Sequence, residues 1–274
     1  MADDSTSSRK TIFITGGGSG IGRATAVLFA ERGWFVGLGD INEAGLAETQ
    51  ALLPGASFAT RLDVRDRAAW DRALAEFAQA AQGRIDVVFN NAGIALGGSL
   101  LDHSEEEIDR LIAINIRGVI NGARAAHPYL ARSAPGSCLL NTASASAIYG
   151  TGGMSIYSAT KFAVRALTEA LDTEWRMQGI KVASIMPGFI DTPLLDGTAN
   201  AASNVSKRES IAGSKLEFTP VEEVAQAAWE AAHGERLHTP VGKTACAMAH
   251  AARHDPEQLR ANARALMRAP RPKA

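Results

Sequence analysis

Short apolar runs alternate along the chain with longer segments in which apolar residues recur every three or four positions. The short runs predict strands at residues 11–15, 34–39, 57–62, 85–90, 137–141 and 180–186. The longer segments predict helices at residues 21–32, 42–53, 66–81, 104–132 and 155–178. Strands that alternate with helices are typical of a parallel sheet covered on both faces. We therefore predict an α/β fold with a doubly wound parallel sheet.

The composition is that of one soluble domain with a sizeable core, because the 274 residues are 46% hydrophobic and 21% charged. A formal net charge of −1 gives no basic surface of the kind that binds nucleic acid or an acidic membrane, so we expect neither partner. No apolar stretch approaches the roughly 20 residues that span a bilayer. Residues 1–10 are polar and serine-rich, unlike a signal peptide, so we expect a cytoplasmic protein.

The sequence contains two cysteines, Cys138 and Cys246, and neither has the spacing of a metal ligand. Cys138 lies in a predicted strand, so we expect buried or free thiols and no disulfide. The histidines are scattered, and no metal site is predicted.

A glycine-rich segment, residues 16–22, joins the first predicted strand to the first predicted helix. Backbone N–H groups and the positive end of the helix dipole meet at such a junction, where a pyrophosphate can approach without hindrance from side chains. An ordinary flexible loop is the alternative interpretation of the glycines. Their position between a strand and a helix favours dinucleotide binding.

Asp40 follows the second predicted strand, eighteen residues beyond Gly22. A carboxylate at this spacing accepts hydrogen bonds from the ribose hydroxyls of NAD and repels the 2′-phosphate of NADP. Ser19 and Ile41 are uncharged, and the nearest cation in this stretch, Arg23, lies in the first predicted helix. We therefore predict NAD as the cofactor, with NADP less favoured. The alternative role of Asp40 is that of a turn residue at the end of a strand.

Tyr157 and Lys161 stand four residues apart in a predicted helix and so share one of its faces. The pKa of a free tyrosine is roughly 10, and a neighbouring ammonium lowers it by stabilising the phenolate. The pair, with Ser144 upstream, predicts a unit that moves a proton and a hydride. Because Tyr and Lys at this spacing are also a common surface pair, the other motifs must support this hypothesis.

Together these segments resemble the short-chain dehydrogenase/reductase family, in its compact single-domain branch, over about residues 10–245. The family's glycine motif is matched by residues 15–22, its Asn-Asn-Ala-Gly motif by residues 90–93, and its Tyr-x-x-x-Lys motif by Tyr157 and Lys161. The resemblance implies a Rossmann-like sheet of about seven strands. The catalytic residues that it implies are Asn115, Ser144, Tyr157 and Lys161. The cofactor-binding residues that it implies are Thr15, Gly16, Gly18, Ser19, Gly20, Ile21, Gly22, Asp40, Ile41, Asp63, Val64, Asn91, Ala92, Gly93, Tyr157, Lys161, Pro187, Gly188, Ile190 and Thr192.

The predicted chemistry is the interconversion of a secondary alcohol and a ketone. Tyr157, as phenolate, takes the proton of the hydroxyl while a hydride passes to the nicotinamide. The resemblance implies that Lys161 holds the nicotinamide ribose and that Asn115 anchors a water linking Lys161 to solvent. Ser144 can bind the substrate oxygen. Ser146 competes with it, and the family spacing selects Ser144.

The substrate pocket is expected along residues 94–96, 145–154 and 189–218, which are mainly apolar and small. Tyr149 is assigned to its wall. These segments favour a hydrophobic alcohol or ketone, and residues 193–203 are expected to form a lid. The cations Lys207, Arg208 and Lys215 are interpreted as solvated charges more readily than as a carboxylate site.

The C-terminal part departs from the family pattern, because residues 237–244 stand where a final strand and an Asp-Gly-Gly ending are common. We expect residues 1–9 to be a flexible segment, residues 10–245 the catalytic domain, and residues 246–274 a helical extension. Its apolar stripe contains Leu259, Ala263, Leu266 and Met267. This stripe either packs on its own subunit or covers a neighbour. The resemblance implies a homodimer or homotetramer.

Two other classes of protein stay open as alternatives. One is a cofactor-binding regulator that has lost turnover, and the other is an NAD-dependent epimerase or dehydratase that uses the same Tyr-Lys pair. The intact catalytic residues argue against the first, and the absence of room for a separate substrate domain argues against the second.

Overall fold

A seven-stranded parallel sheet forms the centre of the computed structural model, which describes residues 9–196, 208 and 218–268. Its strands are β1 (Thr11–Thr15), β2 (Phe35–Asp40), β3 (Phe58–Arg61), β4 (Val87–Asn90), β5 (Ser137–Thr142), β6 (Ile180–Pro187) and β7 (His238–Val241). Their order in the sheet is β3-β2-β1-β4-β5-β6-β7, and every neighbouring pair is parallel. The predicted doubly wound sheet is confirmed.

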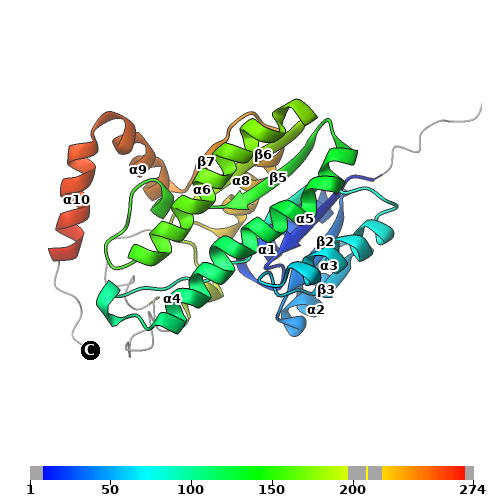
Figure 1. Cartoon of the computed structure of the whole chain (residues 1–274), viewed down its shortest axis with the longest axis horizontal. Helices are drawn as coiled ribbons and strands as arrows, with labels where there is room; N and C mark the ends of the chain where they lie inside the picture. The colour runs from blue at the N-terminus through cyan, green and yellow to red at the C-terminus, as the bar shows by residue number, and fades with distance from the viewer. Residues whose placement is uncertain (1–8, 197–207, 209–217, 269–274) are drawn as a thin grey trace, which may run out of the picture.

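Helices cover both faces of the sheet, and Figure 1 shows α5 and α6 crossing it on the side toward the viewer. That face carries α3 (Arg67–Ala80), α5 (Gly118–Ser133) and α6 (Ser155–Trp175). The opposite face carries α1 (Gly20–Glu31), α2 (Glu43–Leu52) and α8 (Val221–His233). Alternate strand residues supply the two cores: Ile12 and Ile14 point to the second face and Phe13 to the first. The central strands are therefore buried on both sides, and this packing fixes the positions of the strand ends.

The predicted helix at residues 104–132 is divided into three parts. It begins as α4 (Glu105–Ile112), widens into a π-helical turn at Ala113–Arg117, and continues as α5. A capping box forms at its start: Ser104 Oγ accepts from the Glu107 N–H at 3.2 Å, and the Ser104 N–H donates to Glu107 Oε2 at 3.0 Å. The predicted helix is thus confirmed over this range, with one wide turn that apolar spacing does not register.

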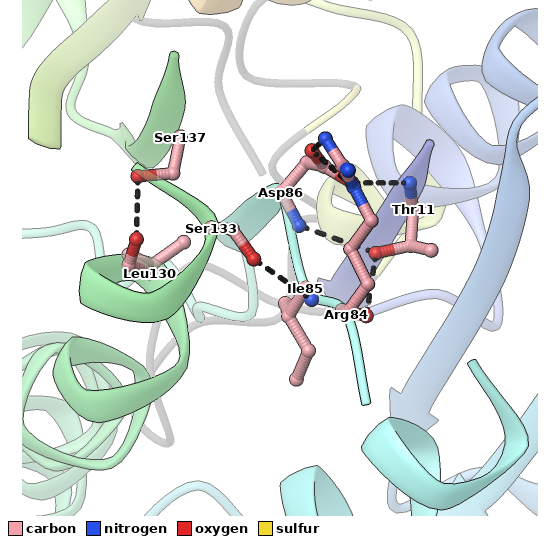
Figure 2. A network of polar contacts seen from close by, with 7 residues as sticks. All are labelled: Thr11, Arg84, Ile85, Asp86, Leu130, Ser133 and Ser137. Atoms are coloured by element: carbon pink, nitrogen blue, oxygen red, sulfur yellow. Dashed lines mark hydrogen bonds and ion pairs between the residues drawn. The ribbon is translucent and has the colours of Figure 1, made fainter. Parts of the chain in front are cut away.

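A buried polar network joins β1 to the start of β4 at the amino ends of the strands (Figure 2). Asp86, only 1% exposed, accepts from the Thr11 N–H at 2.9 Å and from two guanidinium nitrogens of Arg84 at 2.8 and 2.5 Å. Thr11 Oγ1 donates to the Arg84 carbonyl at 3.0 Å. Beside this network, Ser133 Oγ accepts from the Ile85 N–H at 3.3 Å, which ties the end of α5 to the same corner. The contacts lie at the opposite end of the sheet from the carboxyl ends of the strands.

The C-terminal segment continues the fold. Residues 237–244, expected to depart from the family pattern, nonetheless supply β7, which pairs with β6. They are followed by α9 (Lys243–His254) and α10 (Pro256–Arg268), which stand together at one end of the molecule in Figure 1. Leu259 of α10 is buried within the chain, so this part of the apolar stripe packs on its own subunit. The side chains of Leu266 and Met267 lie outside the described residues.

Two further properties bear on the expectations from sequence. Cys138 of β5 is buried and Cys246 of α9 is exposed, and both are free thiols, as predicted. Among the described residues, no helix combines the length and apolar character needed to cross a bilayer.

Candidate active site

The carboxyl ends of β1, β4 and β5 are bound together at the point where the chain order of the sheet reverses. Thr15 Oγ1 accepts from the N–H groups of Asn91 and Ala92, each at 3.1 Å. The Asn91 amide donates to the Thr15 carbonyl at 3.0 Å and accepts from Thr142 Oγ1 at 3.1 Å. Ligands of open α/β sheets bind in the crevice outside such a switch point. The matched residues Thr15, Asn91 and Ala92 thus form one edge of a candidate cofactor crevice.

The glycine loop leaves the amino end of α1 accessible. A Cβ at Gly22 would lie 2.0 Å from the Gly16 carbonyl oxygen, and Gly16 has a φ of +67°, so neither position admits a larger residue without strain. Ser19 makes no side-chain hydrogen bond to the first turn of α1, whereas Asn42, Asp66 and Ser104 cap α2, α3 and α4. The first-turn N–H groups of α1 are therefore available to an anion.

Asp40 is fixed beside this loop. Its Oδ2 accepts from the Gly18 N–H at 2.9 Å, and its Oδ1 accepts from the Asn42 N–H at 2.9 Å. The structure thus places the predicted ribose-binding carboxylate against the glycine loop. Ile41, next along the chain, is exposed.

Asp63 has a partner that the sequence analysis did not anticipate. The Arg65 guanidinium binds its carboxylate, with Nη2 at 2.6 Å from Oδ2, and this hydrogen bond lowers the pKa of Asp63. Val64 is buried and packs on Gly118: a Cβ added at Gly118 would lie 2.7 Å from Val64 Cγ2. The signal that could have revealed the pair was the arginine two residues after Asp63.

The π-helical turn places Asn115 next to the loop after β4. Its Oδ1 accepts from the Ile94 N–H at 3.0 Å, and its Nδ2 donates to the Ile94 carbonyl at 2.9 Å and to Thr160 Oγ1 at 3.2 Å. The side chain of Asn115 therefore holds the loop after β4 and α6 at a fixed separation. The predicted role in anchoring a water stays a prediction.

Lys161 lies between the end of β5, the Tyr157 ring and the loop after β4. Its Nζ donates to the Thr142 carbonyl at 2.8 Å and lies 5.7 Å from the centroid of the Tyr157 ring. A Cβ at Gly93 would lie 3.6 Å from this Nζ and 3.3 Å from Asn115 Oδ1, so the glycine lies close to both side chains. Burial lowers the pKa of Lys161 to about 8.

The lowering of the Tyr157 pKa was expected from Lys161 together with oxidised nicotinamide, and it stays a prediction, because in the protein alone the shift has the opposite direction. Burial raises the pKa of Tyr157, and a hydrogen bond with Ser144 offsets part of this increase. The Lys161 ammonium is directed to the Thr142 carbonyl, so its proximity does not outweigh the loss of water around the phenol.

Ser144 and Ser146 occupy different surroundings. Ser144 interacts with the Tyr157 phenol, and its Oγ also accepts from the Ser146 N–H at 3.1 Å. Ser146 Oγ pairs with Thr151 Oγ1 at 3.1 Å. Ser144 is therefore the serine associated with the tyrosine, and it also accepts a hydrogen bond from the backbone of the turn that follows β5.

The loop after β6 forms the facing side of the crevice. The Gly188 N–H donates to the Val241 carbonyl at 3.1 Å, Ile190 is buried and bridges to Thr219, and Pro187 ends β6. Thr192 packs on the glycine loop, where its Cγ2 would be 3.1 Å from a Cβ at Gly20. The sequence-predicted residues of β1, β4, α6 and this loop are thus linked by contacts at the carboxyl end of the sheet.

The expected pocket and lid are described in part. The Gly98 N–H donates to the Gly153 carbonyl at 2.8 Å, so the loop that follows residues 94–96 contacts the 145–154 segment. Of the expected lid, residues 193–196 are described and the rest lies outside the described residues, as do Lys207 and Lys215. Arg208 forms ion pairs with Asp191 and, at 2.9 Å, with Asp196. Both aspartates are exposed, and the interpretation of Arg208 as a solvated charge rather than a site for a substrate carboxylate stays a prediction.

The chain belongs to the short-chain dehydrogenase/reductase family and has its NAD(P)-binding Rossmann fold. The family model for short chain dehydrogenases matches residues 10–202, which is more than half of the chain. The predicted resemblance is confirmed.

Particular relatives place the chain within this family. It is 38% identical to the 2,5-dichloro-2,5-cyclohexadiene-1,4-diol dehydrogenase LinX of Sphingobium indicum over 205 residues, covering 73% of this chain and 80% of the relative. It is 33% identical to the probable oxidoreductase EphD of Mycobacterium tuberculosis over 264 residues, covering 92% of this chain but only 44% of the relative. The chain thus spans less than half the length of EphD. The structure of a short-chain dehydrogenase/reductase from Burkholderia phymatum, solved with NAD, is similar to this one with a TM-score of 0.79. The two sequences are 27% identical, and the match covers 97% of this chain and 98% of that one.

Proposed function

We propose that the chain is an NAD-dependent dehydrogenase that interconverts a hydrophobic secondary alcohol and its ketone. The observation that carries this proposal is the grouping of Ser144, Tyr157 and Lys161, which hydrogen bonds through Thr142 and Asn91 connect to Thr15 at the start of the glycine loop. The relative LinX is a diol dehydrogenase by name, and the Burkholderia phymatum structure contains NAD. Both support alcohol oxidation with a nicotinamide cofactor.

The residues present fit a bound dinucleotide, because the α1 N–H groups are uncapped and Gly16, Gly18 and Gly22 keep the loop free of side chains. Asp40 would bind the adenosine ribose, and Lys161 the nicotinamide ribose. A bound nicotinamide would supply the hydride acceptor for alcohol oxidation and the hydride donor for ketone reduction. Asp63 and Val64 would lie at the adenine, and residues 187–192 at the nicotinamide.

Tyr157 acts as the general acid and base in this proposal. In oxidation it takes the proton of the substrate hydroxyl, and in reduction it returns a proton to the carbonyl oxygen. Ser144 holds the same oxygen and stabilises the charge that develops on it. The positive charge of Lys161, 5.7 Å from the ring centroid, would together with that of a bound oxidised nicotinamide lower the Tyr157 pKa from the raised value that burial gives in the protein alone.

The proposed preference for NAD over NADP rests on Asp40. Its carboxylate is held by two backbone N–H groups, from Gly18 and Asn42, so its position is fixed and it stays next to the glycine loop. A fixed negative charge at this place repels a 2′-phosphate.

We also propose a homo-oligomer, a dimer or a tetramer. Ile112 of α4 and Phe162 of α6 are large apolar side chains that are 41% and 39% exposed, and contact with a second copy would cover them.

The proposal is tested by following the absorbance of reduced nicotinamide while the protein turns over a panel of alicyclic, aryl and steroid alcohols with NAD. The Tyr157→Phe variant should lose at least about 100-fold in kcat, because general acid and base catalysis contributes about this much or more. Binding of NAD should change little.

Tyr149→Phe is the matched control, since it removes a phenol from the expected pocket wall and leaves the catalytic one in place. Full activity in Tyr157→Phe would contradict the assignment of the base. NAD binding without turnover of any alcohol or ketone would favour a regulator that binds the cofactor.

A further inference from the structure

Two arginines lie close to Asp40, and each is paired with a glutamate of α2. Arg23 Nη2 lies 2.7 Å from Glu48 Oε2, and Arg61 Nε lies 3.5 Å from Glu43 Oε1. Glu43 and Glu48 thus hold one guanidinium each at the edge of the candidate crevice.

The positions of both arginines are fixed relative to Asp40. Arg23 Nη2 donates to the Gly18 carbonyl at 2.6 Å, while the Gly18 N–H donates to Asp40 Oδ2 at 2.9 Å, so Arg23 and Asp40 bind two groups of the same residue. Arg61 is the register partner of Asp40 across β2 and β3. Both cations therefore lie beside the place where Asp40 would bind the adenosine ribose.

Guanidinium groups are the preferred side-chain partners of phosphate, which they bind through paired, charge-assisted hydrogen bonds. An arginine next to the ribose would by itself favour NADP. In this chain Arg23 is already bound to Glu48, to the Gly18 carbonyl and, through Nε at 3.0 Å, to Thr49 Oγ1.

We propose that Glu48 and Glu43 are specificity-determining residues for the cofactor: they hold Arg23 and Arg61 in ion pairs and so deny a 2′-phosphate its cationic partners. This inference rests on the proposed NAD site and adds two residues to Asp40 as determinants. Discrimination against NADP then comes from repulsion by Asp40 and from the neutralisation of the two nearby cations.

The two ion pairs are suited to such a test because they contribute little to folding. The side chains of Glu48 and Glu43 are 66% and 71% exposed, and exposed ion pairs add at most about 1 kcal/mol to stability. Replacing the glutamates therefore removes the ion pairs with Arg23 and Arg61 at little cost in folding stability.

The experiment measures dissociation constants of oxidised NAD and NADP by isothermal titration calorimetry at low ionic strength. In Glu48→Gln the affinity for NADP relative to NAD should rise roughly tenfold, the effect of one new charge-assisted hydrogen bond. The rise should be larger in the Glu43→Gln/Glu48→Gln double variant. Affinity for NAD itself should stay within about twofold, because NAD lacks the 2′-phosphate.

Two controls identify the cause. Glu31→Gln removes the same charge at the other end of α1, about 12 Å from Arg23 along the helix, and should leave the ratio unchanged. In the Arg23→Gln/Glu48→Gln variant the gain from Glu48→Gln should disappear.

An unchanged ratio in the double glutamate variant, while the unaltered protein binds NAD, would overturn this inference and leave the proposed function standing. An equal shift in Glu31→Gln, or a gain that persists without Arg23, would also overturn it. Failure of the unaltered protein to bind either cofactor would overturn the proposed function and this inference with it.

Discussion

Lys161 is a buried ammonium whose hydrogen bond goes to a neutral carbonyl, that of Thr142. Water solvates a charged amine better than this surrounding does, so the charged form is disfavoured and the pKa of Lys161 falls to about 8. Groups held in unfavourable surroundings are common where function requires them, at a cost in stability. Lys161 is therefore expected to destabilise the fold at neutral pH.

Replacing Lys161 by Met should raise the free energy of unfolding at pH 7 by up to the order of 3 kcal/mol, while activity is lost. The ordinary lysine pKa is 10.5 and the folded value is about 8, so between these values the unfolded chain binds more protons. Stability due to this group thus rises with pH from about 8 to 10.5, and the advantage of the variant shrinks over the same interval. Urea unfolding at pH 7 and pH 9.5 measures both effects.

The upper pH is kept below 10 because the raised pKa of Tyr157 acts in the opposite direction, with stability falling as pH rises through the alkaline range. A Lys161→Met variant that is less stable than the unaltered protein at pH 7, with the same dependence on pH, would contradict the account of Lys161.

The sequence predicted the proximity of these residues better than their ionisation. Spacing of four in a helix placed Tyr157 and Lys161 on one face, and the structure has both in α6. Spacing did not register that burial raises the pKa of Tyr157 in the protein alone, because burial depends on neighbours from distant parts of the chain. Thr142, the last residue of β5, and Ser144, which follows the strand, could not be placed around α6 from spacing alone.

At the scale of elements, the π-helical turn at Ala113–Arg117 determines where Asn115 lies. Such a turn amounts to one extra residue within an α-helix, and it often occurs at functional sites. Here it places the Asn115 amide against both Ile94 and Thr160, which belong to different elements. The wide turn thus positions the loop that contains the Asn-Asn-Ala-Gly motif.

Deleting Arg117, an exposed residue in the turn, should convert the segment to a regular α-helix and keep α4 and α5 in phase. Asn115 would then lose its contacts with Ile94 and Thr160. We expect kcat to fall on the order of 100-fold, the effect of a misplacement of about 1 Å, with little change in far-ultraviolet circular dichroism. Arg117→Ala keeps the residue count and should retain activity; equal losses in both variants would count against the role of the turn.

Most helices and strands were predictable because the spacing of apolar residues is a local property of the sequence. The features that this spacing did not reveal depend on tertiary contacts. The start of the helix at Ser104 has a local signal, because Ser104 and Glu107 stand at the spacing of a capping box. The π-helical turn changes the helical phase by only one residue and leaves the apolar pattern nearly intact. The strand β7 was obscured because its sequence, His-Thr-Pro-Val, is short and contains a proline.

At the scale of the whole molecule, one end of the sheet contains the candidate site and the other contains a stabilising polar network. The candidate catalytic and cofactor residues gather at the carboxyl ends of the strands, while the Asp86 network ties the amino ends (Figure 2). Changes at the amino ends should therefore alter stability without altering chemistry.

Asp86→Asn should lower the free energy of unfolding by about 2–3 kcal/mol, because it removes a buried charge that pairs with Arg84 and accepts from Thr11. At 25 °C, where the variant stays folded, kcat should be unchanged. Urea unfolding and steady-state kinetics on the same samples check both expectations.

Asp71→Asn is the control, since it breaks the exposed pair with Arg67 on α3 and should cost less than about 1 kcal/mol. A fall in kcat of Asp86→Asn that matches its fall in stability, measured while the protein is folded, would refute the separation of the two ends.

The two thiols differ in accessibility, so a dye can be attached to one of them selectively. Burial raises the pKa of Cys138 to about 12, so this thiol stays unreactive, while Cys246 lies exposed on α9. The first turn of α9 packs on Gly188, at the loop proposed to contact the nicotinamide. A maleimide dye should therefore attach to Cys246 alone and place a fluorescent label on the helix that packs against this loop, with no engineered cysteine.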